Sequence, residues 1–146
     1  MQTKTRYFVP RNHSIDNLPT DIQHLFLCGF SDYSSHNLIF TNNSYYQLKS
    51  ITIGANGFNR VRNYIVDGLE SLEIVKIGVE CFRISDDERN DGVCQITNCP
   101  NLRQLEIGDW SFEDFKSFEI SNLNSLQSIK FGGYCFRYAE GFSLKR

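Results

Sequence analysis

Apolar side chains recur along the chain in a fixed pattern that reads L-x-x-[ILV]-x-[IF]-G-x-x-x-F. Four segments follow it, at residues 48–58, 72–82, 102–112 and 126–136. Their first leucines are 24, 30 and 24 residues apart. Recurrence of the same positions at a nearly constant interval indicates an internal repeat, which decides the fold before any local propensity does.

A second apolar pair follows each anchor phenylalanine six to eight residues later. It reads Tyr64-x-Val66, Phe118-x-Ile120 and Phe142-x-Leu144 in three repeats. In the remaining repeat the equivalent is Cys94-x-Ile96, displaced by an insertion near 84–92. Each unit therefore contains two short apolar segments joined by polar residues.

A fainter copy precedes these four. Its anchors are Ile22, Leu25 and Leu27, with Cys28 at the glycine position and with Leu38 and Phe40 as the second half. The chain is thus expected to form one domain over 1–146. An irregular N-terminal segment, 1–21, comes before repeats at about 22–47, 48–71, 72–101, 102–125 and 126–146.

The apolar spacing predicts short strands rather than helices. L-x-x-I-x-I ends in the alternation of a half-buried strand, and the invariant glycine after it predicts a tight corner with positive φ. The second apolar pair predicts another short strand or a 3₁₀ turn. Since one unit cannot bury its own apolar side chains, stacked units are expected to form one core. The expected fold is a mainly β repeat solenoid with a parallel sheet and little or no long helix.

This pattern resembles the leucine-rich repeat, and the I-x-I-G-x-x-x-F variant is most similar to the BspA-like subfamily of bacterial and protist surface proteins. The resemblance covers 22–144 and implies protein binding. One departure matters. The usual repeat has an asparagine eight residues after the first leucine, and the residues at that position here are Asn56, Glu80, Trp110 and Tyr134. The standard asparagine ladder is therefore absent, and the resemblance leaves the structure opposite the sheet open.

Charge and hydropathy exclude several classes of protein. A net charge of −2 and a pI of about 5.9 argue against nucleic-acid binding, which usually requires a basic surface. No apolar run approaches the roughly 18 residues of a membrane span. The first ten residues lack the apolar core of a signal peptide, which favours a cytoplasmic protein or a fragment of a larger chain.

All five cysteines fall at structural positions of the repeat. Cys81 and Cys135 share a position with Gly57 and Ser111, and the others are Cys28, Cys94 and Cys99. Buried free thiols are expected at these positions. A metal site and a disulfide are the alternatives.

No catalytic motif stands out, so the chain is expected to have no enzymatic activity, no cofactor and no metal. His13, His24 and His36 lie in the N-terminal third and do not recur in the repeat. Nothing in the sequence places a nucleophile and an acid beside one of them, as catalysis requires. The acidic insertion at 85–91 is interpreted as a solvated loop, with partner contact or calcium binding as alternatives.

Exposed repeat positions carry the candidates for partner binding. They are Lys49, Thr52, Glu73, Ile74, Lys76, Arg103, Glu106 and Lys130 on the sheet, together with Trp110 and Tyr134. Charges alternate in sign along the sheet positions, which fits either a self-paired surface or a ligand face, and Ile74 is the apolar exception. Trp110 and Tyr134 share a repeat position, so they should stack, either within the core or as an exposed anchor.

The leading hypothesis is a non-enzymatic protein–protein interaction module of leucine-rich-repeat type, with a partner whose identity the sequence does not give. The alternative is a structural fragment or a self-associating unit of a longer array. The last repeat shows no polar cap, and an uncapped repeat end exposes apolar side chains and open strand edges. End-to-end self-association follows from that alternative.

Overall fold

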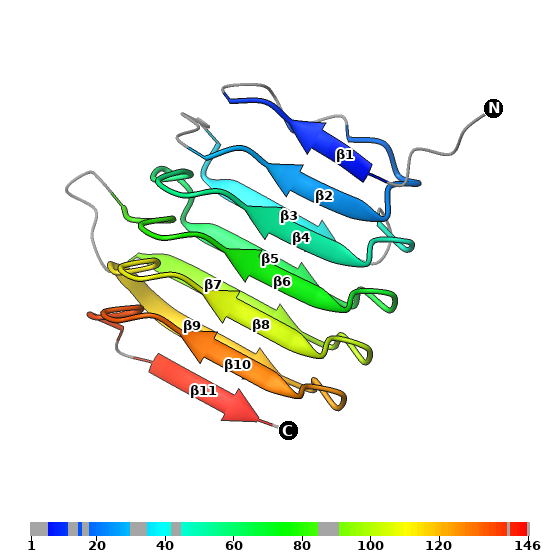
Figure 1. The fold of residues 1–146 in the computed structure, drawn as a ribbon. Coiled ribbons are helices and arrows are strands. Elements are labelled where there is room, and N and C mark those ends of the chain that lie inside the picture. Colours follow the sequence, from blue (N-terminus) through cyan, green and yellow to red (C-terminus); the bar gives the residue numbers. More distant parts are fainter. Residues whose placement is uncertain are drawn as a thin grey trace.

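The computed structural model describes residues 6–11, 15, 18–29, 35–41, 45–84 and 91–139 and the backbone of 141–145. All regular structure in this part of the chain is β-strand, arranged in two parallel sheets (Figure 1). The described residues include no helix that is long and apolar enough to cross a membrane.

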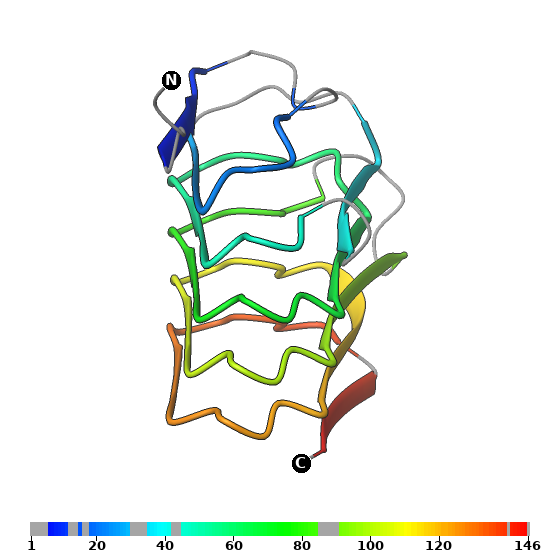
Figure 2. The same cartoon turned by 90° about the vertical axis from the view of Figure 1, so that its right-hand side faces the viewer.

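The two sheets take alternate strands of the chain. The first sheet has the order β1 (Arg6–Val9), β2 (His24–Leu27), β4 (Ser50–Ile53), β6 (Ile74–Ile77), β8 (Gln104–Ile107) and β10 (Ser128–Phe131). The second has the order β3 (Asn37–Thr41), β5 (Asn63–Asp67), β7 (Gly92–Thr97), β9 (Phe115–Ser121) and β11 (Gly141–Lys145). The sheets lie on opposite sides of the stack and are joined by the corners of each unit (Figure 2).

Strand register pairs residues from equivalent positions of the sequence pattern. Leu105 of β8 pairs with Val75 of β6 on one side and with Ile129 of β10 on the other. Leu38 and Phe40 of β3, from the faint first copy, pair with Tyr64 and Val66 of β5. The second half of each unit, which the pattern left between strand and 3₁₀ turn, is a strand in every unit.

The space between the sheets holds the apolar anchors. Leu48, Leu72 and Leu102, the first residues of three repeats, have no exposed surface. The anchor phenylalanines stack in a row, with ring centroids 5.6 Å apart for Phe58–Phe82, 4.5 Å for Phe82–Phe112 and 4.9 Å for Phe112–Phe136. Near-parallel rings at these distances pack favourably beyond the area that they bury, so these four rings form a spine along the core.

The expected role of the repeat glycine is wrong. None of Gly54, Gly78 and Gly108 has positive φ. A Cβ on Gly78 would lie 2.8 Å from the backbone nitrogen of Ala55, and one on Gly108 would lie 2.6 Å from the carbonyl carbon of Gly78. The position requires glycine because adjacent units approach too closely for any side chain, and not because of its backbone conformation.

Most of the left-handed corner positions hold residues other than glycine. Positive φ values fall on the second residue after each repeat glycine and on each anchor phenylalanine; these residues are Asn56, Glu80, Trp110, Tyr134, Phe58, Phe82, Phe112 and Phe136. At the opposite corner positive φ falls on Gly68, Asn98 and Asn122. Asparagine and glycine tolerate this region readily, so the second corner has a sequence signal that the first lacks.

An amide ladder runs along the second corner. Asn98 donates to the Asp67 carboxylate at 2.8 Å, and Asn122 donates to the Asn98 amide oxygen at 2.7 Å. This ladder links three units in place of the standard asparagine ladder.

The N-terminal segment differs from expectation. Within 1–21, which should be irregular, β1 pairs in parallel with β2 through Tyr7–Leu25 and Val9–Leu27. Residues 6–9 therefore supply a strand of an additional, degenerate unit. The repeat pattern did not reveal it because neither the leucine nor the glycine of the motif is present.

Candidate functional site

One exposed row of side chains runs across the first sheet. Thr52, Lys76, Glu106 and Lys130 are direct neighbours on β4, β6, β8 and β10. Register extends this row to Phe26 and Phe8, and Phe8 is 62% exposed. This apolar end was not predicted from the sequence, because β1 was not expected. The row thus changes from aromatic to charged along the stack.

The neighbouring row on the same sheet is less exposed than expected. Ser50 is only 8% exposed, and its hydroxyl lies 2.7 Å from Nδ1 of His24 on β2. Ile74 and Gln104 are half-buried. A catalytic histidine also needs an acid to orient it, and His24 has no such hydrogen bond within the described part of the chain. We interpret the His24–Ser50 contact as a cross-strand pair that stabilises the sheet.

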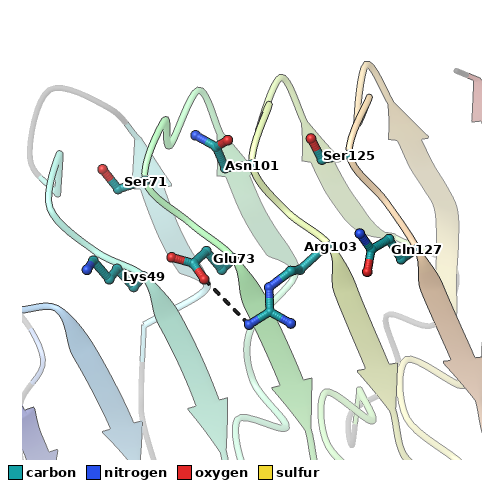
Figure 3. Close-up of a pocket in the computed structure, with 7 residues that line it drawn as sticks. All are labelled: Lys49, Ser71, Glu73, Asn101, Arg103, Ser125 and Gln127. Carbon is teal, nitrogen blue, oxygen red and sulfur yellow. Dashed lines mark ion pairs between the residues drawn. The ribbon is translucent and has the colours of Figure 1, made fainter.

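A shallow polar groove of about 420 Å³ lies at the start of the first-sheet strands (Figure 3). Two rows of side chains line it: Lys49, Glu73, Arg103 and Gln127 form one, and Ser71, Asn101 and Ser125 form the other. Glu73 and Arg103 make an ion pair at 3.5 Å, as the alternating charges predict. Both side chains are well exposed, so the pair contributes at most about 1 kcal/mol. The groove is lined by polar side chains, and the charges of Glu73 and Arg103 neutralise each other. Both features are typical of a solvated surface.

A different surface brings together Trp110 and Tyr134. Their rings stack with centroids 4.3 Å apart and an interplanar angle of 17°. Tyr134 is 57% exposed and Trp110 is half-buried. Of the two interpretations that the sequence left open, this geometry favours an exposed aromatic pair over a core pair.

Two arginines flank this aromatic pair. The guanidinium carbon of Arg137 lies 5.2 Å from the Tyr134 ring centroid and 5.1 Å from that of Tyr138, and it lies 5.9 Å from Trp110. The guanidinium carbon of Arg83 lies 5.9 Å from the Trp110 ring centroid. Cations at these distances are attracted to the ring faces, so the arginines and the rings hold one another in place.

Glu113 forms ion pairs with both arginines. Its carboxylate is 3.2 Å from Arg83 and 3.9 Å from Arg137, and the residue is only 7% exposed. Positions 83, 113 and 137 each follow an anchor phenylalanine, so the stack places them in one row. We call the set Arg83, Trp110, Glu113, Tyr134, Arg137 and Tyr138 the corner patch. The sequence indicated the aromatic row, Trp110 and Tyr134. The row of Arg83, Glu113 and Arg137 was not predicted, because this repeat position does not hold the same residue type in each unit.

The thiols are held inside the stack. All five cysteines are free, with Cys81, Cys94 and Cys99 buried. Burial raises the pKa of Cys81 and of Cys99 to about 11, and a nucleophilic cysteine requires the opposite shift. Cys81 and Cys135 donate to the carbonyls of Gly54 and Gly108, each at 3.0 Å.

Ser111, at the same repeat position as Cys81 and Cys135, donates its hydroxyl to the Gly78 carbonyl at 2.8 Å. In three of the four copies this position therefore holds a small side chain that bonds to the preceding unit, and the remaining copy has Gly57. Within the described ranges, no cluster of three or more His, Cys, Asp or Glu side chains could hold a metal ion. Of the acidic insertion at 85–91, residues 85–90 lie outside the described residues.

Comparison with known proteins adds no assignment. No family model matches the chain. No curated protein and no solved structure matches it either.

Proposed function

We propose that the chain is a leucine-rich-repeat-type solenoid that acts as a non-enzymatic protein-binding module, with the corner patch as its binding surface. The exposed Trp110–Tyr134 stack, held by Arg83 and Arg137, carries this proposal. The repeat pattern and the two stacked parallel sheets support the solenoid. The high thiol pKa values support a role without covalent chemistry.

The residue types of the patch are those that contribute most to protein–protein binding. Tryptophan, tyrosine and arginine are enriched among binding hot spots, and these lie in well-packed centres surrounded by weaker contacts. Here the aromatic rings are already stacked and both guanidiniums are already placed. A partner would therefore lose little side-chain entropy in docking, and prior ordering of this kind raises affinity.

The other candidate surfaces fit a partner less well. Glu73 and Arg103 neutralise each other in the polar groove, and Lys76 lies beside Glu106 on the sheet. Exposed pairs of this kind change association rate and salt dependence more than affinity. We therefore leave these residues, together with Lys49, Thr52, Ile74 and Lys130, outside the proposed binding surface.

Affinity capture with matched tyrosine variants tests the proposal. Tyr134→Ala removes an exposed ring from the patch, and Tyr46→Ala removes an equally exposed ring elsewhere, since the two residues are 57% and 56% exposed. We expect a partner from the source cell that binds the wild type and Tyr46→Ala but is lost with Tyr134→Ala and with Arg137→Ala.

Titration of the purified partner then gives the magnitude. Trp110 is the only tryptophan of the chain, so its fluorescence reports directly on the patch. A hot-spot tyrosine contributes at least about 2 kcal/mol, which corresponds to a roughly 30-fold weaker Kd for Tyr134→Ala. A partner that binds Tyr134→Ala as tightly as Tyr46→Ala would show that the corner patch is not the binding surface.

A further inference from the structure

The polar groove at the start of the first-sheet strands crosses four units of the stack (Figure 3). One wall has the residue that precedes each strand, from Lys49 to Gln127, and the other has the residue two positions earlier, from Ser71 to Ser125. The leucine between the two walls is buried, as at Leu72. Each unit therefore presents its polar side chains at the same place, and neighbouring subsites of the groove are one unit apart.

Most of the polar groups in this groove are available to a ligand. Glu73 pairs with Arg103 at 3.5 Å, and Asn101 donates to the carbonyl of Glu70 at 2.6 Å. Within the described ranges, the other lining side chains make no hydrogen bond or ion pair; they are Lys49, Ser71, Ser125 and Gln127. An ammonium, two hydroxyls and a carboxamide supply both donors and acceptors, so they favour a ligand that carries both kinds of group.

The walls argue against several other ligands. All seven lining side chains are polar, so an apolar group would bury little apolar surface there. Glu73 lies between Lys49 and Arg103 in its row, so an anion would meet a carboxylate as well as two cations, and like charges in contact are unfavourable.

The spacing of the subsites separates the two common kinds of extended polymer. Neighbouring strands of a sheet lie about 4.8 Å apart, whereas side chains on one face of an extended peptide repeat every roughly 6.6 Å. A peptide laid along the groove would therefore fall out of step with the units. A sugar ring in a straight glycan advances by nearly one unit spacing, and its hydroxyl groups both donate and accept.

We infer that the groove binds a straight, β-1,4-linked glycan, with one sugar ring against each unit. The equatorial linkages of such a chain keep it extended along the stack. Its hydroxyl groups replace the hydrogen bonds that water makes to the walls, which is how a solvated polar surface can hold a ligand. Each ring adds a small gain, and the gains accumulate because the rings are linked.

Titration calorimetry with β-1,4-linked oligosaccharides of two to six rings, built from glucose, N-acetylglucosamine or mannose, tests the inference. We expect at least one of the three series to bind. In that series each ring added from two to four should lower the Kd by roughly 3- to 10-fold, the gain from one net hydrogen bond. Further rings should change the Kd little, because the groove crosses four units.

Two of the unpaired side chains provide the variants. Ser71→Ala and Gln127→Ala each remove a group from one wall without breaking a hydrogen bond to the described residues, and each should weaken tetraose binding by roughly 5-fold. The matched control is Gln95→Ala on β7 of the second sheet, which should leave the Kd unchanged.

Four outcomes would overturn the inference. They are the failure of all three series to bind, a Kd that does not depend on chain length, equal weakening by Gln95→Ala and Gln127→Ala, and equal binding of maltohexaose and cellohexaose. The last pair has the same rings, but the α-1,4 linkages of maltohexaose coil the chain away from a straight groove. The groove shares no lining residue with the corner patch, so this inference and the proposed function can fail separately.

Discussion

The anchor phenylalanines hold backbone angles that large side chains seldom adopt. Their φ values are 64° at Phe58, 58° at Phe82, 56° at Phe112 and 53° at Phe136. A left-handed conformation costs about 1–2 kcal/mol for a residue other than glycine, whereas full burial of a phenylalanine side chain stabilises by about 1.5–3 kcal/mol. Burial of the ring therefore offsets the cost of the left-handed conformation. That conformation directs each ring inward, where it joins the spine.

Tyr64 carries a polar atom that the core does not satisfy. The residue is fully buried, and its hydroxyl has no hydrogen-bond partner among the described residues. Burial also raises its pKa well above the ordinary value. In register, Phe118 occupies the same repeat position two strands away.

Replacing Tyr64 by phenylalanine should therefore leave the free energy of unfolding unchanged or raise it by up to about 1 kcal/mol, since an unsatisfied buried hydroxyl is removed while the ring is kept. Urea denaturation measures this. Tyr64→Leu is the control. It should lower the free energy of unfolding by more than about 1 kcal/mol, because ring contacts are lost. A clear loss of stability in Tyr64→Phe would show that the hydroxyl does have a partner.

At the scale of the element, the two corners of each unit are built differently. The second corner has Gly68, Asn98 or Asn122 at positive φ, which are residues that fit this conformation. The first corner has Glu80 and Trp110 there, and adjacent units are fixed by the close approach of their glycines. The first corner is thus the more strained, and the corner patch is built on it.

Substitutions at Glu80 should reveal this strain. Both Glu80→Gly and Glu80→Ala remove the Glu80–Arg83 ion pair, so their difference isolates the backbone. At φ 58° we expect the glycine variant to be more stable than the alanine variant by about 1 kcal/mol. Glu119, exposed in the extended strand β9, is the control: there alanine should be more stable than glycine. Thermal unfolding of the four variants measures both differences, and the same order at both positions would contradict a left-handed corner at residue 80.

At the scale of the whole molecule, each unit contacts only its neighbours in the stack. The stability of such an array is approximately a sum over units and their interfaces. Central strands have a neighbour on both sides, whereas β10 has one and its Ile129 is partly exposed. Stability should therefore fall toward β10.

Hydrogen exchange should follow this gradient. At a concentration at which the chain is monomeric, we expect the amides of β6 and β8 to exchange at least about 10-fold more slowly than those of β10, a difference of about 1.4 kcal/mol in opening free energy. Uniform protection along the stack would contradict this gradient.

The sequence by itself determined the mainly β class, the short apolar segments that form strands from β2 onward, and the stacking of Trp110 on Tyr134. These follow from spacing, because residues one repeat apart must lie side by side once units stack in register. Only the tertiary structure decided that the glycines are required for close approach, that β1 extends the first sheet, and that Arg83, Glu113 and Arg137 form one row. These features depend on contacts between units. Such contacts do not require the same residue type in every repeat, and neither does a strained corner, so the repeat pattern does not reveal them.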